Sequence, residues 1–543
     1  MTDLRKLCCA FAAAMLLSAC GSDNDASPPN TGTPSTGTPN AAASETDVNS
    51  ASKAPGPSST LKETECVTPA LKAVNAKCWS LNVAENRDAP DGNRIVLPVG
   101  VIHTTDDPAQ RPEDPILFFV GGTADSALAN EDYIRHYLDM AAPRSLIIWD
   151  MRGLFHAQPN LQCPDFDLPQ NILNAYAGYP SFSDEPIAAR VEATGQDYAD
   201  CLAKLRSEGV NVEFYNGFEM ARDAADLMRL LGYDTYNVMG QSAGTGHVFN
   251  FIQYFDDHIR AAIYDAPWIT QARDRPAVNI LHQAYDDALD LLEHCRRDDP
   301  NCADILPNPS ATLIEARARL DREPFTTNVT LPSGEERALE FDGSKLVGRL
   351  YGGMDGGYGD FPRVLKTVAE GDYRLLPDFF DIENAVIPPE NDPIWTLGAM
   401  AAYECGDMNR VKPSKAAVIN MFEREPALLY GFDTGAFCSW WDAETSAPLE
   451  HHSWFQHDTP SLVLVGEADP CCGRQYGERL HRHNDLVYIA EFAGRGHNSR
   501  GRALSSDGRP CQREIVSEFL SDPNQKPDMS CLAGYKREWN LAP

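Results

Sequence analysis

The chain has 543 residues, of which 43% are hydrophobic, and it carries a formal net charge of −33 at pH 7. This composition is typical of a globular protein with an acidic surface, and the length fits either about three domains or one large α/β core with an inserted lobe. Proteins that bind nucleic acid without sequence preference neutralise phosphates with clustered lysine and arginine, so the charge argues against that class and favours small molecules, peptides or cationic ligands.

The N-terminal segment has the features of a bacterial export signal. Two basic residues precede an apolar stretch, residues 7–19, which is shorter than the ~20 residues of a permanent membrane-spanning helix. Residues 17–21 read Leu-Ser-Ala-Cys-Gly and resemble the lipobox of bacterial lipoproteins, in which cleavage leaves the cysteine acylated and N-terminal. We therefore expect residues 1–19 to be removed and Cys20 to anchor the protein by lipid in the cell envelope. Gly21 favours the outer membrane, with the periplasm or the cell surface as the compartment.

The next segment is predicted to be a disordered linker, residues 20–60. It consists mostly of Ser, Thr, Pro, Gly, Asn and Ala and has almost no large apolar side chain. Such a segment cannot form a packed core. As a flexible tether it spans roughly 35 Å, enough to hold a folded domain away from the lipid headgroups.

The cysteines indicate a disulfide-bonded protein. Twelve remain once the two in the leader and the expected lipidated residue are set aside from the 15 in the chain. An even number in an exported protein favours disulfides, and no zinc-site spacing is present. Pairing sequence neighbours predicts five structural disulfides: Cys66–Cys78, Cys163–Cys201, Cys295–Cys302, Cys405–Cys438 and Cys511–Cys531. Cys471 and Cys472 are left over, and they either form a strained vicinal disulfide or stay reduced.

Six short apolar runs bounded by turn signals predict buried strands. They are residues 116–120, 146–149, 236–239, 261–264, 462–465 and 486–489. Runs without polar alternation fit strands that are covered on both faces. Before the third run, residues 220–231 repeat apolar side chains at helical spacing, and Gly232 ends the pattern. The order strand, helix, strand predicts an α/β fold with a mostly parallel sheet.

The long stretch between the fourth and fifth strands differs in character. Helical patterns occupy residues 279–297 and 311–320. We therefore predict a mainly helical lid, residues 269–450, inserted beside the carboxyl edge of the sheet. The α/β core then has two parts, residues 61–268 and 451–543.

Ser242 is the best candidate for a catalytic residue. It lies in Gly-Gln-Ser-Ala-Gly, residues 240–244, which matches G-x-S-x-G between a predicted strand and a helical stretch at 243–255. Small residues flank the serine of such a nucleophile elbow because the turn is strained and crowded. The strand and the helix around the motif predict that Ser242 is a nucleophile.

A serine nucleophile needs a base, and the base needs an orienting carboxylate. His497 lies in a glycine-containing loop after the last predicted strand, and Asp469 follows the preceding strand. Both are therefore expected at carboxyl ends of strands, and the order Ser, Asp, His agrees with that of α/β-hydrolases. Glu467 is the alternative acid.

Acyl transfer also needs donors for the developing oxyanion. The backbone N–H of Ala243, directly after the nucleophile, is one candidate. Gly122, in the Gly-Gly-Thr-Ala segment at residues 121–124, is the other. The alternative for Gly122 is an ordinary turn at the end of a strand.

With these residues the chain resembles the α/β-hydrolase superfamily, and within it the proline iminopeptidase and tripeptidyl aminopeptidase group of secreted serine peptidases. The resemblance rests on residues 150–164, which begin Asp-Met-Arg-Gly, on residues 215–232, which lead to the elbow, and on the C-terminal stretch with the acid and the base. It covers most of residues 90–268 and 430–535. It implies an α/β-hydrolase fold, helices on both faces of the sheet, and an aminopeptidase that cleaves short peptides through an acyl-enzyme with no metal or organic cofactor.

Two motifs depart from that group. Relatives usually have Tyr-Gly after the serine, where this chain has Ala243 and Gly244, and a Gly-Gly-Pro-Gly oxyanion segment, where residues 121–124 read Gly-Gly-Thr-Ala. These differences affect the choice of substrate. A carboxylesterase or amidase acting on small acyl substrates therefore stays open, as does a non-catalytic envelope-binding lipoprotein.

The remaining features are expected to be structural. His451, His452 and His457 have a spacing that gathers no ligand face on a helix, so we expect a solvated loop rather than a metal site. Trp440 and Trp441 are expected to be buried in the core of the lid. The glycine-rich residues 351–357 lack the Lys-Ser/Thr of a phosphate loop and are expected to form a mobile part of the lid.

Overall fold

The computed structural model describes residues 59–122, 126–163, 186–269, 276–330, 336–353, 358–380, 396–408, 412–426, 434–469, 471–497 and 510–542. All of them belong to a single unit of the chain, Ala54–Pro543. The predicted leader, Cys20 and nearly all of the predicted linker lie outside these residues. No helix among the described residues is long and apolar enough to cross a membrane.

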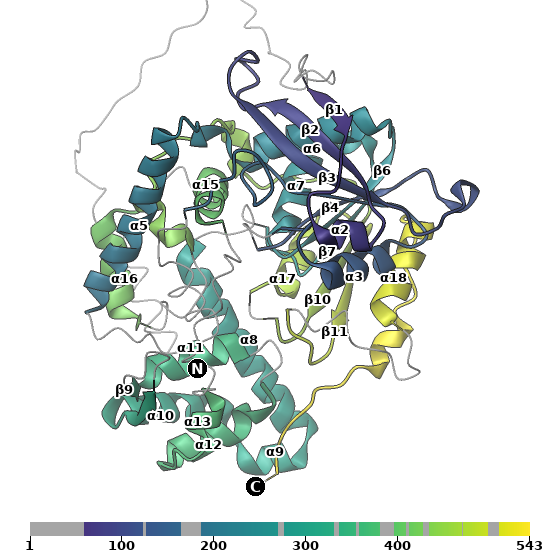
Figure 1. The fold of residues 1–543 in the computed structure, drawn as a ribbon. Coiled ribbons are helices and arrows are strands. Elements are labelled where there is room, and N and C mark those ends of the chain that lie inside the picture. Colours follow the sequence, from purple (N-terminus) through teal and green to yellow (C-terminus); the bar gives the residue numbers. More distant parts are fainter. Residues whose placement is uncertain are drawn as a thin grey trace, which may run out of the picture. The chain divides into compact units, whose positions relative to one another are not determined.

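A nine-stranded sheet forms the centre of the described fold (Figure 1). In spatial order its strands are β1 (Thr60–Glu63), β2 (Lys77–Ala84), β3 (Arg94–Ile102), β5 (Leu146–Trp149), β4 (Ile116–Phe119), β6 (Tyr236–Gln241), β7 (Ile259–Asp265), β10 (Ser461–Gly466) and β11 (Val487–Phe492). The strands from β5 to β11 are parallel to one another, whereas β1, β2 and β3 pair in antiparallel fashion. The predicted α/β fold with a mostly parallel sheet is confirmed.

The six predicted runs are the six parallel strands β4, β5, β6, β7, β10 and β11. All residues of β4, β5, β6 and β10 are buried, which is why these runs show no polar alternation. The antiparallel strands were not predicted. β2 mixes buried apolar residues with half-buried polar ones and β1 is a short, mostly exposed edge strand, so neither gives a continuous apolar signal.

Helices flank the sheet. They are α2 (Pro69–Ala73), α3 (Glu131–Ala141), α6 (Gly217–Leu231), α7 (Gly244–Phe255), α17 (Arg474–His481) and α18 (Cys511–Ser521). Another helix, α5 (Ile187–Ser207), packs instead on the insertion described below. The predicted helix before the elbow is α6. It begins where the side chain of Asn216 accepts the backbone N–H of Glu219 at 3.0 Å, and it ends at Gly232, whose φ of 85° is left-handed.

An insertion of mostly helical elements, residues 266–460, separates β7 from β10. Its helices are α8 (Pro276–Asp298), α9 (Pro300–Ile305), α10 (Pro309–Arg322), α11 (Gly343–Gly353), α12 (Phe361–Glu370), α13 (Leu376–Phe379), α15 (Leu397–Met408) and α16 (Lys415–Arg424). The two predicted helices of this region are α8 and α10. An antiparallel hairpin, β8 (Phe325–Thr330) with β9 (Glu336–Phe341), was not predicted. Gly352 and Gly353 end α11, and the other glycines of the glycine-rich segment lie outside the described residues.

Short 3-10 helices complete the described elements. They are η2 (Pro108–Gln110), η3 (Val212–Phe214), η4 (Asp256–His258), η6 (Tyr358–Asp360), η8 (Thr434–Ser439), η9 (Leu449–His452) and η11 (Ser530–Gly534).

The buried apolar side chains of the described residues form two clusters. The larger one joins the sheet to α5, α15, α16 and η8, and the smaller one lies among α8, α10, α11, α12 and α13. Trp440 and Trp441 are buried, as expected, but in the larger cluster rather than in a core of the insertion alone. A Cβ on Gly195 of α5 would overlap with the indole ring of Trp440, so α5 packs directly on this part of the insertion.

The expectation of a solvated loop around residues 451–457 is wrong for two of its three histidines. His451 is fully buried, and its Nε2 lies 3.1 Å from Oδ1 of Asp407 on α15. His457 is also buried, and its ring lies against those of Phe249 and Phe455. Asp407 and Phe249 come from other elements of the fold, which the local spacing could not indicate.

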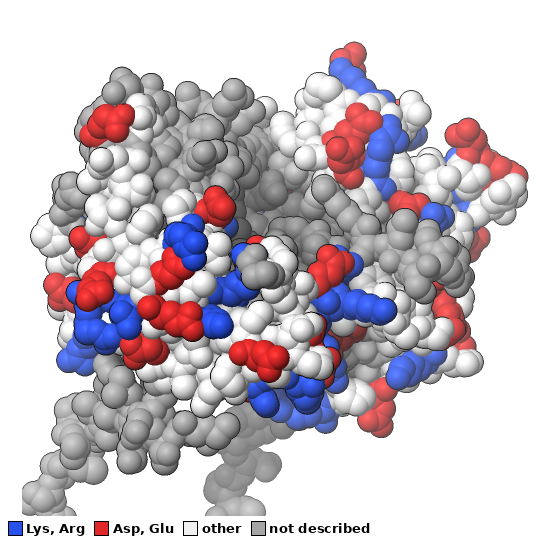
Figure 2. All heavy atoms as spheres, turned by 90° about the horizontal axis from the view of Figure 1, so that it is seen from below, with Lys and Arg blue, Asp and Glu red and all other residues white. Residues whose placement is uncertain are grey.

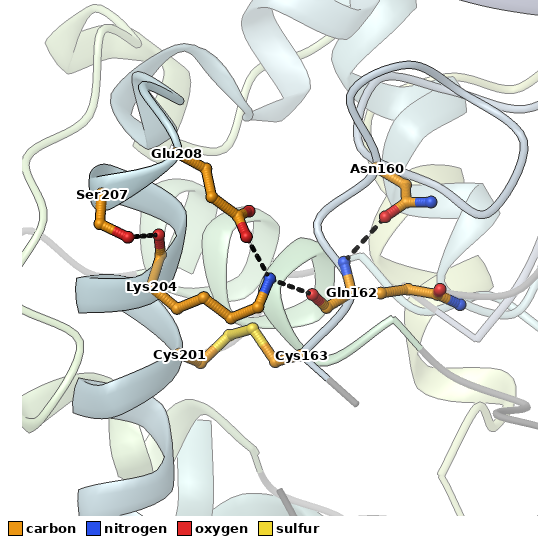
Figure 3. The surroundings of a disulfide bond; sticks show 7 residues. All are labelled: Asn160, Gln162, Cys163, Cys201, Lys204, Ser207 and Glu208. Atoms are coloured by element: carbon orange, nitrogen blue, oxygen red, sulfur yellow. Dashed lines mark hydrogen bonds and ion pairs between the residues drawn. A yellow bond between two sulfur atoms is a disulfide. The ribbon is translucent and has the colours of Figure 1, made fainter. Parts of the chain in front are cut away.

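Five disulfides link the same pairs that neighbour pairing predicts: Cys66–Cys78, Cys163–Cys201, Cys295–Cys302, Cys405–Cys438 and Cys511–Cys531. Figure 3 shows Cys163–Cys201, which joins the segment after β5 to α5. Beside it, Nζ of Lys204 donates to the Glu208 carboxylate at 2.8 Å and to the Gln162 carbonyl at 3.5 Å. The covalent bond and the lysine together fix α5 to the segment that follows β5.

On the face drawn in Figure 2, the acidic side chains do not gather into a single patch. Acidic and basic side chains are interspersed there. Several described pairs of opposite charge are spaced four residues apart on helices, such as Arg135 with Glu131 and Arg474 with Glu478. Mixed charges of this kind favour solubility rather than steering of one type of ligand on that face.

Candidate active site

Ser242 occupies a strained turn between β6 and α7. Its φ is +53°, a left-handed conformation that is uncommon for residues other than glycine. The backbone holds this conformation from both sides. The N–H of Ser242 donates to the Asp265 carbonyl at 2.8 Å, and its carbonyl accepts from the N–H of Thr245 at 2.9 Å and from the Thr245 hydroxyl at 2.6 Å.

The glycines of the motif are required by close packing. A Cβ on Gly240 would overlap with the carbonyl oxygen of Gly244, and a Cβ on Gly244 would overlap with that of Phe119 at the end of β4. The G-x-S-x-G segment therefore has the geometry of a nucleophile elbow, as its sequence predicted.

Asp469 and His497 form a buried pair. Nδ1 of His497 lies 2.9 Å from Oδ2 of Asp469, and the two residues are 5% and 1% exposed. The other carboxylate oxygen, Oδ1, accepts the backbone N–H groups of Cys471 at 3.2 Å and Cys472 at 3.0 Å. Burial by itself lowers the pKa of His497, but the charge of Asp469, the neighbouring Cys471 and the hydrogen bonds to both raise that pKa well above its usual value.

Glu467, the alternative acid, has another role. Its carboxylate pairs with the guanidinium of Arg537, with Nε at 3.0 Å, and accepts the N–H of Gly494 at 2.9 Å. It thereby fixes the start of the loop that carries His497. A Cβ on Gly466 would overlap with the carbonyl oxygen of Arg495, so this loop passes directly over the end of β10.

Gln241, the variable position before the serine, was not predicted to take part. Its Nε2 lies 3.4 Å from Nε2 of His497, and its Oε1 accepts the hydroxyl of Tyr133 at 3.3 Å. The Nε2 edge of the imidazole therefore faces the turn that carries Ser242. The motif gives no signal for this contact because its second position accepts any residue.

The two candidate oxyanion residues lie on adjacent segments. Ala243 caps α7 at its N-terminal end, and Gly122 follows β4 with a left-handed φ of 70°. The packing of Gly244 on the carbonyls of Phe119 and Val120 brings these segments together. Thr123 and Ala124 lie outside the described residues.

A second Ser, His and Asp grouping lies at the ends of β4 and β5. Nδ1 of His156 lies 2.8 Å from Oδ2 of the buried Asp150, and the Ser126 hydroxyl donates to Oδ1 of Asp150 at 2.9 Å. However, Ser126 Oγ lies 3.3 Å from the same nitrogen, Nδ1, that faces the carboxylate. A general base must accept the serine proton on its other nitrogen, so this grouping lacks the order of a catalytic triad.

Neither Cys471 nor Cys472 is part of a disulfide in the structure, as in the reduced alternative of the two left open by the sequence. Their sulfur atoms lie 2.6 Å apart. Sγ of Cys471 also lies 3.5 Å from Oδ1 of Asp469 and 3.7 Å from Nδ1 of His497. The pair is thus in direct contact with the candidate acid and base.

Comparisons with known proteins give structural likeness only. No family model matches the chain. No curated protein matches it either. Among solved structures, the chain is similar to a thermophilic esterase from Thermogutta terrifontis, with 14% identity, a TM-score of 0.32, and coverage of 82% of this chain and 99% of that one.

Two further structures show the same degree of likeness. A proline iminopeptidase from Mycobacterium smegmatis is 16% identical to this chain, with a TM-score of 0.34. An epoxide hydrolase mutant from Vigna radiata is 12% identical, also with a TM-score of 0.34. Each comparison covers 82% of this chain and 98% of the other chain. Likeness at this level carries no argument about the reaction, so the function must be argued from the site.

Proposed function

We propose that the chain is an exported serine hydrolase that acts as an aminopeptidase on short peptides. One observation carries the proposal: the imidazole of His497 is held by Asp469 at one nitrogen while its other nitrogen faces the Gln241–Ser242 turn. Ser242 itself has the strained backbone of a nucleophile elbow. These three side chains come from the ends of β6, β10 and β11, the positions that the sequence predicted.

In the proposed reaction, the hydroxyl of Ser242 attacks the substrate carbonyl and passes its proton to Nε2 of His497. Asp469 keeps the proton of Nδ1 in place and stabilises the imidazolium, which then protonates the leaving amine. The N–H groups of Ala243 and Gly122 stabilise the oxyanion. Water then attacks the acyl-enzyme by the same route in reverse, and no metal or organic cofactor takes part.

The preference for peptides rests on the resemblance of residues 150–164 and 215–232 to secreted aminopeptidases. In the structure, the arginine of the Asp-Met-Arg-Gly segment is buried, and Arg152 makes two hydrogen bonds to Asp223 of α6, at 2.7 and 2.8 Å. This ion pair holds the segment after β5 in place. Because Arg152 and Asp223 are buried and bonded to each other, we expect other residues to select the substrate. Ester hydrolysis is therefore an outcome that the experiment must be able to detect.

Export and lipidation form part of the proposal. Five disulfides are typical of proteins from oxidising compartments, which supports export. Lipidation of Cys20 is tested by incorporation of a labelled fatty acid in a bacterial host. We expect label in the wild-type chain and none in Cys20→Ser, and label in both would refute an anchor at this residue.

The activity is tested by labelling the purified full chain with a fluorophosphonate probe and by offering it aminoacyl, tripeptidyl and short-chain ester reporters. Ser242→Ala is expected to abolish labelling and to lower turnover by up to about a millionfold. Ser126→Ala is the matched control, because Ser126 is a buried serine that also lies beside an Asp–His pair. This variant should still label.

The outcomes separate the alternatives. Turnover of peptide reporters supports the aminopeptidase, whereas turnover of esters alone identifies an esterase on the same triad. Loss of labelling in Ser126→Ala but not in Ser242→Ala would overturn the assignment of the nucleophile. Folded wild-type protein that neither labels nor turns over any reporter would favour the non-catalytic binding lipoprotein.

A further inference from the structure

We propose that Cys471, Cys472, Asp469 and His497 form a binding site for one thiophilic divalent cation, such as Zn²⁺, whose occupancy switches off the hydrolase. Each of the four residues offers one ligand atom, and these atoms all lie within 4.8 Å of one another. The inhibitory effect rests on the proposed function, whereas the binding of the cation does not.

The donor set has the chemistry that zinc prefers. Cysteine sulfur, histidine nitrogen and carboxylate oxygen are its usual protein ligands, at about 2.3 Å for sulfur and about 2.0–2.2 Å for nitrogen and oxygen. In a tetrahedral site these bond lengths separate a sulfur ligand from a nitrogen or oxygen ligand by roughly 3.6 Å. Sγ of Cys471 lies 3.7 Å from Nδ1 of His497 and 3.5 Å from Oδ1 of Asp469. The separations of the Cys471 sulfur from the nitrogen and oxygen ligand atoms therefore already suit one cation.

The fourth ligand needs only a side-chain adjustment. The two sulfur atoms lie 2.6 Å apart, whereas two thiolates on one zinc ion are separated by about 3.8 Å. Cys472 is buried, and Cys471 is partly exposed. Rotation of Cys472 about its Cα–Cβ bond is therefore the movement that completes the site, because it leaves Sγ of Cys471 at the distances given above, and the partly exposed Cys471 is the side that solvent reaches.

The backbone already organises this cluster. The N–H groups of both cysteines donate to the carboxylate of Asp469, so the two thiols and the acid are held on one tight turn after β10. His497 reaches the same turn from the loop after β11. This site was not predicted from the sequence because its ligands do not follow the paired-cysteine spacing of structural zinc sites.

Occupancy has a direct chemical consequence for catalysis. A cation on Nδ1 takes the place of the proton that faces Asp469, and the single proton of the neutral imidazole moves to Nε2. Both thiols release their protons to solvent as they bind. Nε2 then carries a hydrogen and cannot accept the proton of Ser242, so the bound enzyme lacks its general base.

Binding is measured first, without reference to activity. The full chain, carrying Cys8→Ser, Cys9→Ser and Cys20→Ser so that only Cys471 and Cys472 remain outside disulfides, serves as the wild-type background. It is treated with a low concentration of a phosphine reductant, freed of the reductant, and checked by mass spectrometry for two thiols and five intact disulfides. Zn²⁺ is then titrated in competition with a chromogenic chelator. We expect one Zn²⁺ per wild-type chain, none for the C471S/C472S double variant, and at least a tenfold weaker Zn²⁺ affinity for Cys471→Ser. Mg²⁺, which prefers oxygen ligands, should not compete.

A control variant tests for binding at surface histidines. His258→Gln removes an exposed histidine at the amino end of β7, the opposite end of the sheet from the site, and should bind one Zn²⁺ as the wild type does. Thermal unfolding of each variant verifies that it is folded. A reduced, folded wild type that binds no Zn²⁺, or a double variant that binds as much as the wild type, overturns the proposal. A Cys471–Cys472 disulfide that persists after reduction overturns it as well.

Inhibition is measured as the rate of fluorophosphonate labelling with and without Zn²⁺, each variant being compared with its own metal-free rate. Stoichiometric Zn²⁺ should slow labelling of the wild type at least tenfold, a chelator should restore it, and the double variant should not respond. If the wild type binds Zn²⁺ but never labels, the proposed hydrolase fails while the cation site stands. If it binds Zn²⁺ and labels at an unchanged rate, the inhibitory part of the inference is overturned.

Discussion

The amide nitrogen of Gln241 lies 3.4 Å from Nε2 of His497, on the imidazole edge opposite Asp469. The side chain directly before the proposed nucleophile thus touches the nitrogen that accepts a proton in the proposed reaction. A neutral amide at this position leaves the imidazole free to change its protonation state, whereas a charged group would not.

This contact predicts the effect of Gln241→Glu. A carboxylate beside Nε2 stabilises the imidazolium, so kcat/KM at neutral pH should fall and the pH profile should move to higher pH. Gln241→Met, which has a similar length and no charge, is the control and should not move the profile upward. The two profiles are measured with the best reporter substrate, and an equal shift in both variants would show that the contact acts by packing alone.

The pH dependence of the wild type follows from His497. Its pKa is raised despite burial, chiefly by the charge of Asp469, and a general base works only in its neutral form. We expect kcat/KM to fall as the pH drops through an apparent pKa above about 6.5, the ordinary value for histidine. Asp469→Asn should lower this apparent pKa and reduce kcat about ten-thousandfold. An acidic limb that does not move in this variant would contradict the assignment of Asp469.

Two buried histidines predict acid sensitivity of the fold. Burial lowers the pKa of His247 and of His457 to about 4. An unfolded chain binds a proton at these residues near pH 6.5 but the folded chain does so only near pH 4, so stability is lost as the pH falls between these values. Each residue contributes a loss of about 3 kcal/mol by pH 4.

His457→Leu tests this linkage. Within the described structure, neither ring nitrogen of His457 has a hydrogen-bond partner, and leucine has a similar volume, so little stability should be lost at pH 7. At pH 4.5 the variant should unfold at a higher temperature than the wild type. His258→Leu, at an exposed histidine, should show no such gain. Equal acid sensitivity of the wild type and His457→Leu would mean that other groups govern acid unfolding.

A side chain added at Gly195 should disturb the packing of α5 on the insertion. An added methyl group would overlap with the ring of Trp440, where α5 meets the insertion. Gly195→Ala should therefore cost about 1–3 kcal/mol of stability, partly offset by up to about 1 kcal/mol of better helix propensity. Ala193→Ser adds one atom to an exposed position of the same helix and should leave the unfolding temperature nearly unchanged. A Gly195→Ala variant as stable as this control would show that the α5 interface is loosely packed.

The sequence predicted the parts of the fold whose signals are local. Strands such as β5 are buried throughout, so their residues form continuous apolar runs, and the elbow requires glycine at fixed positions beside Ser242. The hairpin of β8 and β9 was missed because its residues are largely polar. His451 was misplaced because its partner, Asp407, lies on α15 and is close only in the folded chain.

The same reasoning explains the candidate site. Ser242, Asp469 and His497 were predictable because each follows a strand in a motif with a chemical purpose. Gln241 and Cys471 were not, because their contacts with His497 depend on how two loops meet above the sheet. Side chains that act by lying next to a catalytic group leave no spacing pattern in the sequence.

The pairing of β7 with β10 joins two halves of the proposed active site that are far apart along the chain. The nucleophile precedes the insertion, whereas the acid and the base both follow it, and the register of Asp265 with Leu464 brings the halves together. The N–H of Ser242 is bonded to the carbonyl of that same Asp265. The insertion leaves and re-enters the sheet between these two strands. Its length and composition can therefore diverge during evolution while hydrogen bonds between neighbouring strands keep the three proposed catalytic residues at a fixed spacing.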